Sequence, residues 1–264
     1  MDGPEFTARW VQLNTATQTA VLRLWDELTS WRDVDADRFI EQAVPLIQAG
    51  QATVATLTAL FMADRASEQF DVTVQPPEVP VETVTGGRGV PAEEVYRRPF
   101  VEIYTALSAG RPLTTAVDLG RNRLDQIADL DLQRAYSLAA QAAMDDLPED
   151  YRPRFWRRVT TGGKTCALCV VASTQRYTRG DLRRIHRRCD CRVEPDYGGE
   201  TGRRRDDVRL ERVHAAVQEL TGRSDRGARD PDYSQLIVEM TAEHGELGPL
   251  LVRPRDGFTG PDDL

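Results

Sequence analysis

The sequence contains little lysine, cysteine or histidine. Lys164 is the only lysine, so arginine supplies every other basic residue, as a GC-rich coding sequence would produce. There are four cysteines, and all of them lie between Cys166 and Cys191. A secreted disulfide scaffold would spread more cysteines over a small domain. The clustering therefore favours a reducing compartment and a metal site over a set of structural disulfides.

Long hydrophobic runs and targeting signals are also missing from the pattern. No run approaches the roughly 18 apolar residues that a membrane span requires. The first residues, from Met1 to Glu5, lack the basic and apolar regions of a secretory signal. We therefore expect a protein that works in the compartment where it is made and does not engage a membrane.

What is present is the composition of a packed globular protein. The 264 residues are 40% hydrophobic and 29% charged, which is enough for one large core or two smaller ones. The formal net charge of −8 is unevenly distributed. Residues 151–192 contain twelve Lys or Arg, against only Asp181 and Asp190 as acidic residues, so this segment is basic in an otherwise acidic chain.

Apolar periodicity predicts a helical bundle in residues 1–70. Apolar residues recur at three-, four- and seven-residue intervals from Trp10 to Trp31, which predicts a helix over 5–31. Asp35 or Asp37 can cap a second helix, which we expect to end at Gly50 before a third helix begins. Short connections between such helices favour an antiparallel arrangement.

The rest of the chain is divided by proline and glycine. Their density over 71–90 predicts a linker, and Pro91 suits the first turn of a helix that runs to Gly110. A long helix is expected from Thr114 to Asp145, and the alternation in 154–161 predicts a strand. Residues 198–264 are expected to form a polar, partly flexible tail with two helices, over 206–221 and 232–244.

The cysteine-containing segment has the spacing of a zinc knuckle, C-x2-C-x16-H-x2-C-x-C. The candidate ligands are Cys166, Cys169, His186, Cys189 and Cys191. Zinc in a structural site binds four ligands in a tetrahedron, so one of the five candidates would not be a ligand. The spacing does not show which four would bind the metal. Buried thiols or a reversible disulfide remain alternatives. Dithiol catalysis is disfavoured because the βαβ context of a thioredoxin-like site is missing.

Arginines surround these cysteines and have two possible roles. Cations favour the thiolate form of cysteine, and the excess of positive charge can face phosphates of a nucleic acid. The alternative is that the positive face docks on the protein's own acidic helices. The residues concerned include Arg157 and Arg158 and, for contact with a nucleic acid or an acidic partner, Arg183, Arg184, Arg187 and Arg188.

The sequence lacks the common motifs of catalytic sites. Ser173 or a cysteine is a possible nucleophile and His186 a possible base. However, the sequence contains no Gly-x-Ser-x-Gly elbow, no His-Glu-x-x-His helix and no phosphate-binding loop. We therefore assign no catalytic residues.

The order of the residues in this segment resembles a known signature. It runs Gly162-Gly163, Cys166-Ala-Leu-Cys169, Ser173, Tyr177 and His186-x-x-Cys189-Asp-Cys191. This order is similar to the cysteine and histidine signature of the Mu F-like minor head proteins of tailed phages, in particular the actinobacteriophage branch. The resemblance covers about residues 91–195 and is most specific over the final thirty. Arg187 stands where family members often have proline.

The resemblance implies a virion protein of the phage head that is present in the host cytoplasm during assembly. The expected partners are the portal, scaffold and major capsid proteins, with packaged DNA as a further possibility. Related genes are sometimes described as capsid maturation proteases, which makes proteolysis the first alternative function, and a basic zinc-knuckle protein that binds nucleic acid the second. The expected fold is predominantly helical α+β, with a bundle (1–70), a linker (71–90), a Mu F-like core ending in a zinc-knuckle β-hairpin (91–197) and the tail (198–264).

Overall fold

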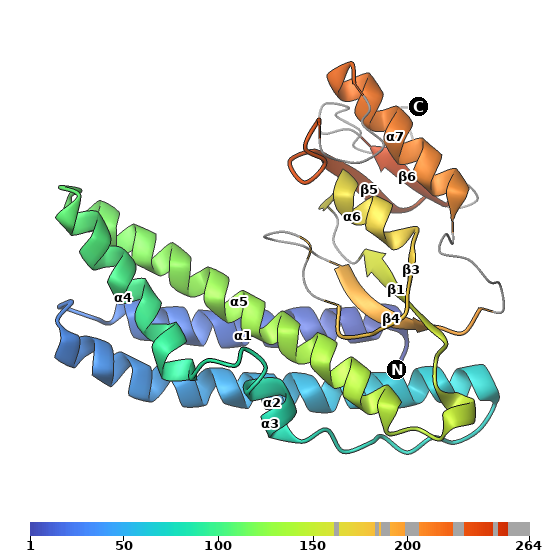
Figure 1. Cartoon of the computed structure of the whole chain (residues 1–264), viewed down its shortest axis with the longest axis horizontal. Helices are drawn as coiled ribbons and strands as arrows, with labels where there is room; N and C mark the ends of the chain where they lie inside the picture. The colour runs from blue at the N-terminus through green and yellow to red at the C-terminus, as the bar shows by residue number, and fades with distance from the viewer. Residues whose placement is uncertain are drawn as a thin grey trace. The chain divides into compact units, whose positions relative to one another are not determined.

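The protein is predominantly helical with small antiparallel sheets, which confirms the expected α+β class. The computed structural model describes residues 1–160, 164–182, 185, 191–198, 206–223, 230–244 and 248–252, and only the backbone for residues 164, 237–244 and 248–252. The chain divides into two compact units, Met1–Arg152 and Pro153–Leu264 (Figure 1). Each unit is described separately below, the first as the helical unit and the second as the cysteine unit.

The helical unit is built from long helices that pack side by side. Its elements are α1 (Gly3–Asp26), α2 (Asp33–Phe70), α3 (Val81–Thr85), α4 (Ala92–Ser108), α5 (Leu113–Asp145) and the 3-10 turn η1 (Glu149–Tyr151). Helix α2 contacts α1, α4 and α5 along its length. The helices on both sides of the expected linker therefore belong to one unit, which extends to Arg152.

The prediction that a helix ends at Gly50 is wrong, because α2 continues through this residue. A Cβ atom at position 50 would lie 2.7 Å from Cγ2 of Thr17 in α1 and 3.2 Å from Cδ2 of Leu132 in α5. The glycine thus allows three helices to approach closely at one point. Its role is packing and not helix termination.

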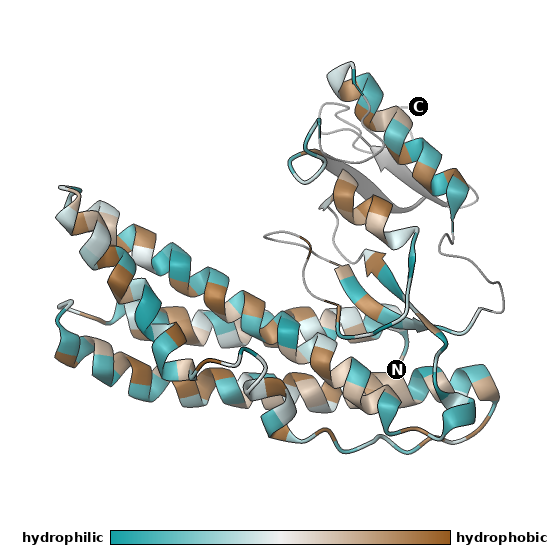
Figure 2. Ribbon diagram, in the orientation of Figure 1, coloured by the Kyte–Doolittle hydropathy of each residue, from teal (hydrophilic) through white to brown (hydrophobic). Residues whose placement is uncertain are grey.

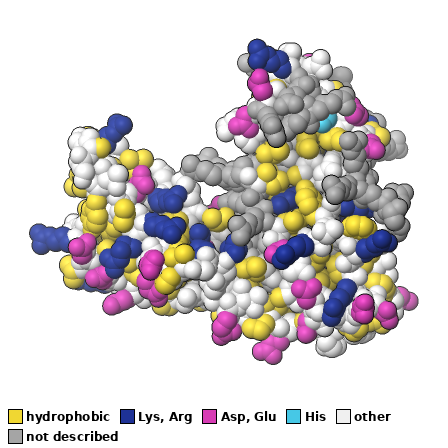
Figure 3. Space-filling view, viewed as in Figure 1, with side chains coloured by type: hydrophobic (Ala, Val, Ile, Leu, Met, Phe, Trp, Pro, Cys, Tyr) yellow, Lys and Arg dark blue, Asp and Glu magenta, His cyan; other side chains and the backbone are white. Residues whose placement is uncertain are grey.

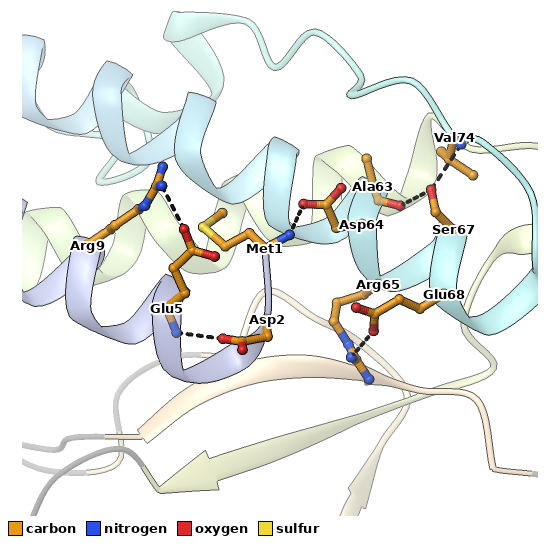
Figure 4. A network of polar contacts seen from close by, with 10 residues as sticks. All are labelled: Met1, Asp2, Glu5, Arg9, Ala63, Asp64, Arg65, Ser67, Glu68 and Val74. Atoms are coloured by element: carbon orange, nitrogen blue, oxygen red, sulfur yellow. Dashed lines mark hydrogen bonds and ion pairs between the residues drawn. The ribbon is translucent and has the colours of Figure 1, made fainter.

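Side-chain hydrogen bonds hold the start of α1 and the chain that leaves α2 (Figure 4). Asp2 accepts a hydrogen bond of 2.7 Å from the backbone N–H of Glu5 at the start of α1, the usual action of an N-cap aspartate. Near the C-terminal end of α2, the Ser67 hydroxyl accepts a 3.0 Å hydrogen bond from the N–H of Val74. This bond holds the chain that leaves α2 against the helix.

Aromatic side chains form much of the buried core of the helical unit. Trp25, Phe39 and Phe100 contact one another, with ring centroids 5.0–5.6 Å apart, and join α1, α2 and α4. Phe6 stacks on Phe61 at 4.3 Å. Such contacts add to the hydrophobic stabilisation by about 0.5–1.5 kcal/mol each.

The segment expected to be a linker, residues 71–90, is partly anchored to the bundle. It contains the short helix α3, whose Val84 is buried. The side-chain amide of Gln51 donates to the carbonyl of Val84 at 3.3 Å, and Arg134 donates to the carbonyl of Gly87. Hydrogen bonds from α2 and α5 therefore hold this segment in place, so it does not act as a free connection.

Helix α2 is the one described helix that is long and apolar enough to cross a membrane by length and composition. It carries no charged residue between Gln42 and Ala63, and Figure 2 shows apolar colours along most of its length. In the structure 56% of its most apolar window is buried against the other helices. That burial is what the central helix of a bundle shows, because its neighbours cover it on several sides.

In the part of the cysteine unit that the structure describes, there are two three-stranded antiparallel sheets and two helices. Its elements are β1 (Phe155–Thr160), β2 (Lys164–Cys166), α6 (Ala167–Ser173), β3 (Arg176–Tyr177), β4 (Cys191–Asp196), α7 (Asp207–Thr221), β5 (Ile237–His244) and β6 (Gly248–Val252). The strand orders are β3-β1-β4 and β2-β5-β6. Strand β1 and helix α7 confirm the strand expected over 154–161 and the helix expected over 206–221.

The helix expected over 232–244 is wrong, because residues 237–244 form strand β5. This strand pairs with β2, with Ile237 opposite Cys166. The N–H of Ala167 also donates to the carbonyl of Leu236 at 2.9 Å. Its second partner is β6, which follows closely in the chain, but β2 lies about seventy residues earlier, so local periodicity could not detect the pairing with β2.

A buried cluster connects α6 and α7. It consists of Ala167, Val170, Leu210, Val213, Val217 and Tyr233. The hydroxyl of Tyr233 lies 2.8 Å from Nδ1 of His214, so the polar ends of both buried side chains have a partner. The C-terminal part of the chain thus supplies core residues to the unit that holds the cysteines.

Candidate metal-binding site

Cys166 and Cys169 lie where strand β2 turns into helix α6. Cys166 is the N-cap of the helix, and its Sγ accepts a hydrogen bond of 3.4 Å from the backbone N–H of Cys169. The two side chains are 7% and 2% exposed. The two-residue gap between them therefore turns both thiols toward the interior, the arrangement that a Cys-x-x-Cys metal knuckle needs.

Cys191 reaches the same place from a different strand. It is the first residue of β4 and pairs with Thr160, the last residue of β1. Its side chain packs against the cluster formed by Cys166 and Cys169. Three cysteines that are separated by up to 25 positions in the sequence thus come together in space.

A buried arginine contacts this group of thiols. Nη1 of Arg158 in β1 donates to Sγ of Cys191 at 3.2 Å, and Arg158 is only 6% exposed. Its guanidinium carbon lies 5.5 Å from the centre of the Tyr177 ring. A permanently charged donor beside a sulfur favours the thiolate form of the cysteine.

Tyr177 lies close to the same sulfurs. Burial raises the pKa of its hydroxyl, negative charge at Cys191 and Cys169 raises it further, and Arg158 lowers it. The hydroxyl donates a 2.9 Å hydrogen bond to the carbonyl of Ala172 at the end of α6. Tyr177 is therefore a neutral side chain that connects β3 to the helix following Cys166.

The described part of the chain does not contain a complete metal site. Among these residues no group of three His, Cys, Asp or Glu side chains meets the geometry of a metal site. The other two candidate ligands, His186 and Cys189, lie outside the described residues, as do Arg183, Arg184, Arg187 and Arg188. Cys166, Cys169 and Cys191 are thus clustered, but these three described side chains do not by themselves form a metal-binding group.

The thiols and their surroundings fit the chemistry of zinc. Thiolate sulfur is a preferred zinc ligand, and sulfurs that bind a metal commonly accept N–H hydrogen bonds. The sulfur of Cys166 accepts such a bond from the backbone of Cys169, and the sulfur of Cys191 accepts one from the side chain of Arg158. Oxygen-preferring cations such as Ca²⁺ and Mg²⁺ do not suit this donor set.

Several arginines of the basic segment bind acidic side chains of the same sheet. Glu194 in β4 forms ion pairs with Arg157 at 2.8 Å and with Arg192 at 2.6 Å. Arg176 pairs with Asp196 at 3.0 Å. The charge of these arginines is thus neutralised within their own sheet, which differs from the predicted docking of the basic segment on the acidic helices. The acidic partners lie on β4 and not on the helices.

Burial and ion pairing oppose each other at Glu194. Burial alone would raise the pKa of this carboxyl, but Arg192 and Arg157 outweigh that effect and hold the pKa below its ordinary value of 4.5. The carboxylate therefore stays ionised inside the sheet. Arg157 is consequently engaged by Glu194 and does not present its charge to an external phosphate.

Ser173 is bonded to the backbone of its own helix. It is buried near the end of α6, and its hydroxyl donates a 2.7 Å hydrogen bond to the carbonyl of Val170. A serine nucleophile needs a base at hydrogen-bonding distance. Within the described ranges, the hydrogen bond that Ser173 makes through its hydroxyl goes to this backbone carbonyl.

The sequence leaves the role of Arg158 open between contact with phosphate and docking on acidic helices, and it does not predict a contact with one particular sulfur. The alternation of buried and more exposed side chains along β1 is the signal that could have shown Arg158 to be buried. Trp156 is fully buried, and residues two apart in a strand share a face, so Arg158 had to point to the same buried side. A buried arginine requires a specific partner, and here that partner is a sulfur.

Comparison of the chain with protein-family models, with curated proteins and with solved structures gives no significant match.

Proposed function

We propose that this chain is a structural minor head protein of a tailed phage whose second unit is stabilised by a zinc ion. The observation that carries the proposal is the meeting of Cys191 with Cys166 and Cys169. The phage signature noted in the sequence contains these three cysteines. Their contact in the fold supports the idea that they act together at one site. A zinc ion bound here would hold β4 against the β2–α6 turn, and its binding energy would stabilise the folded unit.

The zinc part of the proposal is tested by elemental analysis of the full chain, purified with a thiol reductant. We expect one zinc per chain. Cys166→Ser and Cys191→Ser should each lose the metal, because each removes a ligand from a different part of the site. Ser173→Ala is the matched control and should keep it. Zinc-free wild-type protein that is folded would overturn this part of the proposal.

The proposed partners are the portal, scaffold and major capsid proteins. Large apolar side chains are exposed on both sides of the α4–α5 connection, where Val101 and Leu113 are 52% and 53% exposed. Arginine and acidic side chains are interspersed on the visible face of the helical unit (Figure 3). We propose Val101 and Leu113 as contact residues for these partners.

Association during assembly is tested by co-expression with the portal, scaffold and major capsid proteins of a tailed phage. We expect the chain to sediment with procapsids. The double variant Val101→Ser, Leu113→Ser should reduce the amount that sediments, whereas Val208→Ser, a change of a more exposed valine in α7, should not. A chain that stays in the soluble fraction while procapsids form normally would contradict the assembly role.

Proteolysis and nucleic-acid binding have less physical support. The hydroxyl of Ser173 is bonded to a backbone carbonyl, and Arg157, Arg176 and Arg192 are paired with carboxylates. Incubation with capsid or scaffold subunits should therefore give no cleavage that depends on Ser173, Cys189 or His186. Cleavage abolished by these substitutions would make the protease the better assignment. Salt-dependent DNA binding that weakens on neutralising Arg183, Arg184, Arg187 and Arg188 would favour the nucleic-acid role.

A further inference from the structure

Two buried arginines of the three-stranded sheet make different kinds of contact. Arg176 in β3 pairs with the carboxylate of Asp196 and lies 5.8 Å from the centre of the Phe155 ring. Arg158 in β1 also lies over an aromatic ring, that of Tyr177, but its Nη1 donates to the sulfur of Cys191. Arg176 thus has an ordinary structural partner, whereas Arg158 is directed at one of the candidate metal ligands.

The charge of a metal–thiolate centre explains why a cation belongs there. Three or four thiolates bound to zinc give a group with net negative charge, and a buried charge is costly unless a hydrogen-bonded opposite charge accompanies it. Arg158 is 6% exposed and stays protonated at any accessible pH. It is therefore placed to neutralise the centre from inside the sheet.

We infer that Arg158 is a positioning residue of the metal centre, which holds the Cys191 sulfur and compensates the negative charge of the bound thiolates. The inference rests on the zinc site proposed above. Arginine suits the position because its planar group can lie over the Tyr177 ring while one N–H points in the plane toward the sulfur. A lysine would keep the charge but lose this geometry.

The test uses the full chain and three variants, Arg158→Gln, Arg158→Lys and Arg176→Gln. Zinc affinity is measured by competition with a chromophoric chelator, and the thiolate-to-metal absorption is recorded with Co²⁺ in place of zinc. Arg176→Gln is the matched control, because it removes a buried arginine from the same sheet without touching a sulfur. It leaves Asp196 without this partner and should destabilise the sheet at least as strongly.

We expect Arg158→Gln to weaken zinc binding by about 10- to 100-fold, the usual effect of removing a group that supports a metal ligand. Arg158→Lys should weaken it less, and both should shift the Co²⁺ absorption band. Arg176→Gln should bind zinc within about threefold of the wild type, with an unshifted band. If Arg158→Gln does not fold, Arg158→Lys provides the comparison.

Two other outcomes count against the inference and are distinguishable. If the wild type binds zinc and the Arg158 variants match Arg176→Gln in affinity and spectrum, Arg158 has only a structural role and the zinc site stands. If the folded wild type binds neither zinc nor Co²⁺, the proposed site itself fails, and the role of Arg158 fails with it.

Discussion

The hydroxyl of Tyr96 donates a hydrogen bond of 3.0 Å to Oδ2 of Asp131, inside the helical unit. The guanidinium of Arg88 binds the other carboxylate oxygen. Burial raises the pKa of Asp131 above its ordinary value of 3.8, an effect larger than the lowering by Arg88 and Tyr96. The Asp131 carboxyl therefore joins α4, α5 and the segment after α3. Its two hydrogen-bond partners offset only part of the free energy that burial of its negative charge costs.

The raised pKa of Asp131 predicts the sign of a pH effect on stability. The folded state holds the Asp131 proton more tightly than the unfolded state, so the contribution of this group is fully present below about pH 3.8 and declines as pH rises through its folded pKa. The difference in unfolding free energy between the wild type and Asp131→Asn should therefore fall with rising pH. Urea unfolding followed by circular dichroism measures it, and Asp118→Asn, an exposed change in the same helix, is the control. A difference that grows with pH would contradict the assignment.

Glu194 should show the opposite dependence. Its pKa in the folded state lies below the ordinary value of 4.5, so its stabilising contribution is present above that value and is lost as pH falls through the folded pKa. The stability difference between the wild type and Glu194→Gln should shrink as the solution is acidified below about pH 4.5. Glu219→Gln, an exposed substitution in α7, should show no such trend. The same unfolding measurement, repeated between neutral and acid pH, decides the matter.

Gly50→Ala should destabilise the helical unit, although alanine favours helices by about 1 kcal/mol over glycine. The new Cβ would lie 2.7 Å from Cγ2 and 2.9 Å from Oγ1 of Thr17. Overpacking of this kind costs about 1–3 kcal/mol. The double variant Gly50→Ala, Thr17→Ala should recover part of the loss, because the second change removes both atoms. A double-mutant cycle by thermal unfolding tests this, and strictly additive effects would argue against the clash.

Tyr233→Phe should destabilise the cysteine unit by about 1–3 kcal/mol, because it removes the buried hydrogen-bond partner of His214. The double variant Tyr233→Phe, His214→Leu should lose less than the sum of the two single changes, since neither polar group then remains. Near-ultraviolet circular dichroism and thermal unfolding provide the measurement. A Tyr233→Phe protein as stable as the wild type would show that this hydrogen bond contributes nothing to the unit.

Local sequence signals predicted those elements whose structure depends on nearby residues. The alternation around Trp156 predicted β1, and the apolar stripe from Leu210 to Val217 predicted α7. Cys166 and Cys169 were recognised as a pair because their spacing alone places both at one turn. In each case the residues that determine the structure lie within a few positions of one another.

Long-range packing explains where the sequence was misleading. Gly50 has the character of a helix end, and only the approach of Thr17 and Leu132 makes it a packing position. Residues 237–244 were expected to be helical, yet they pair with β2, far earlier in the chain. The contact of Arg158 with Cys191 likewise depends on the pairing of β1 with β4. Periodicity in a single segment carries no information about such distant partners.

The pairing of β5 with β2 also sets an order of events during translation. The helical unit is complete once Arg152 has left the ribosome and can fold while synthesis continues. Strand β2, which carries Cys166, cannot form its pairing before Leu236 and Ile237 have been synthesised. The buried cluster around α6 likewise cannot form before Tyr233 has been synthesised. The thiols therefore remain accessible to solvent, metal and oxidant in the nascent protein until residues 233–237 have emerged from the ribosome.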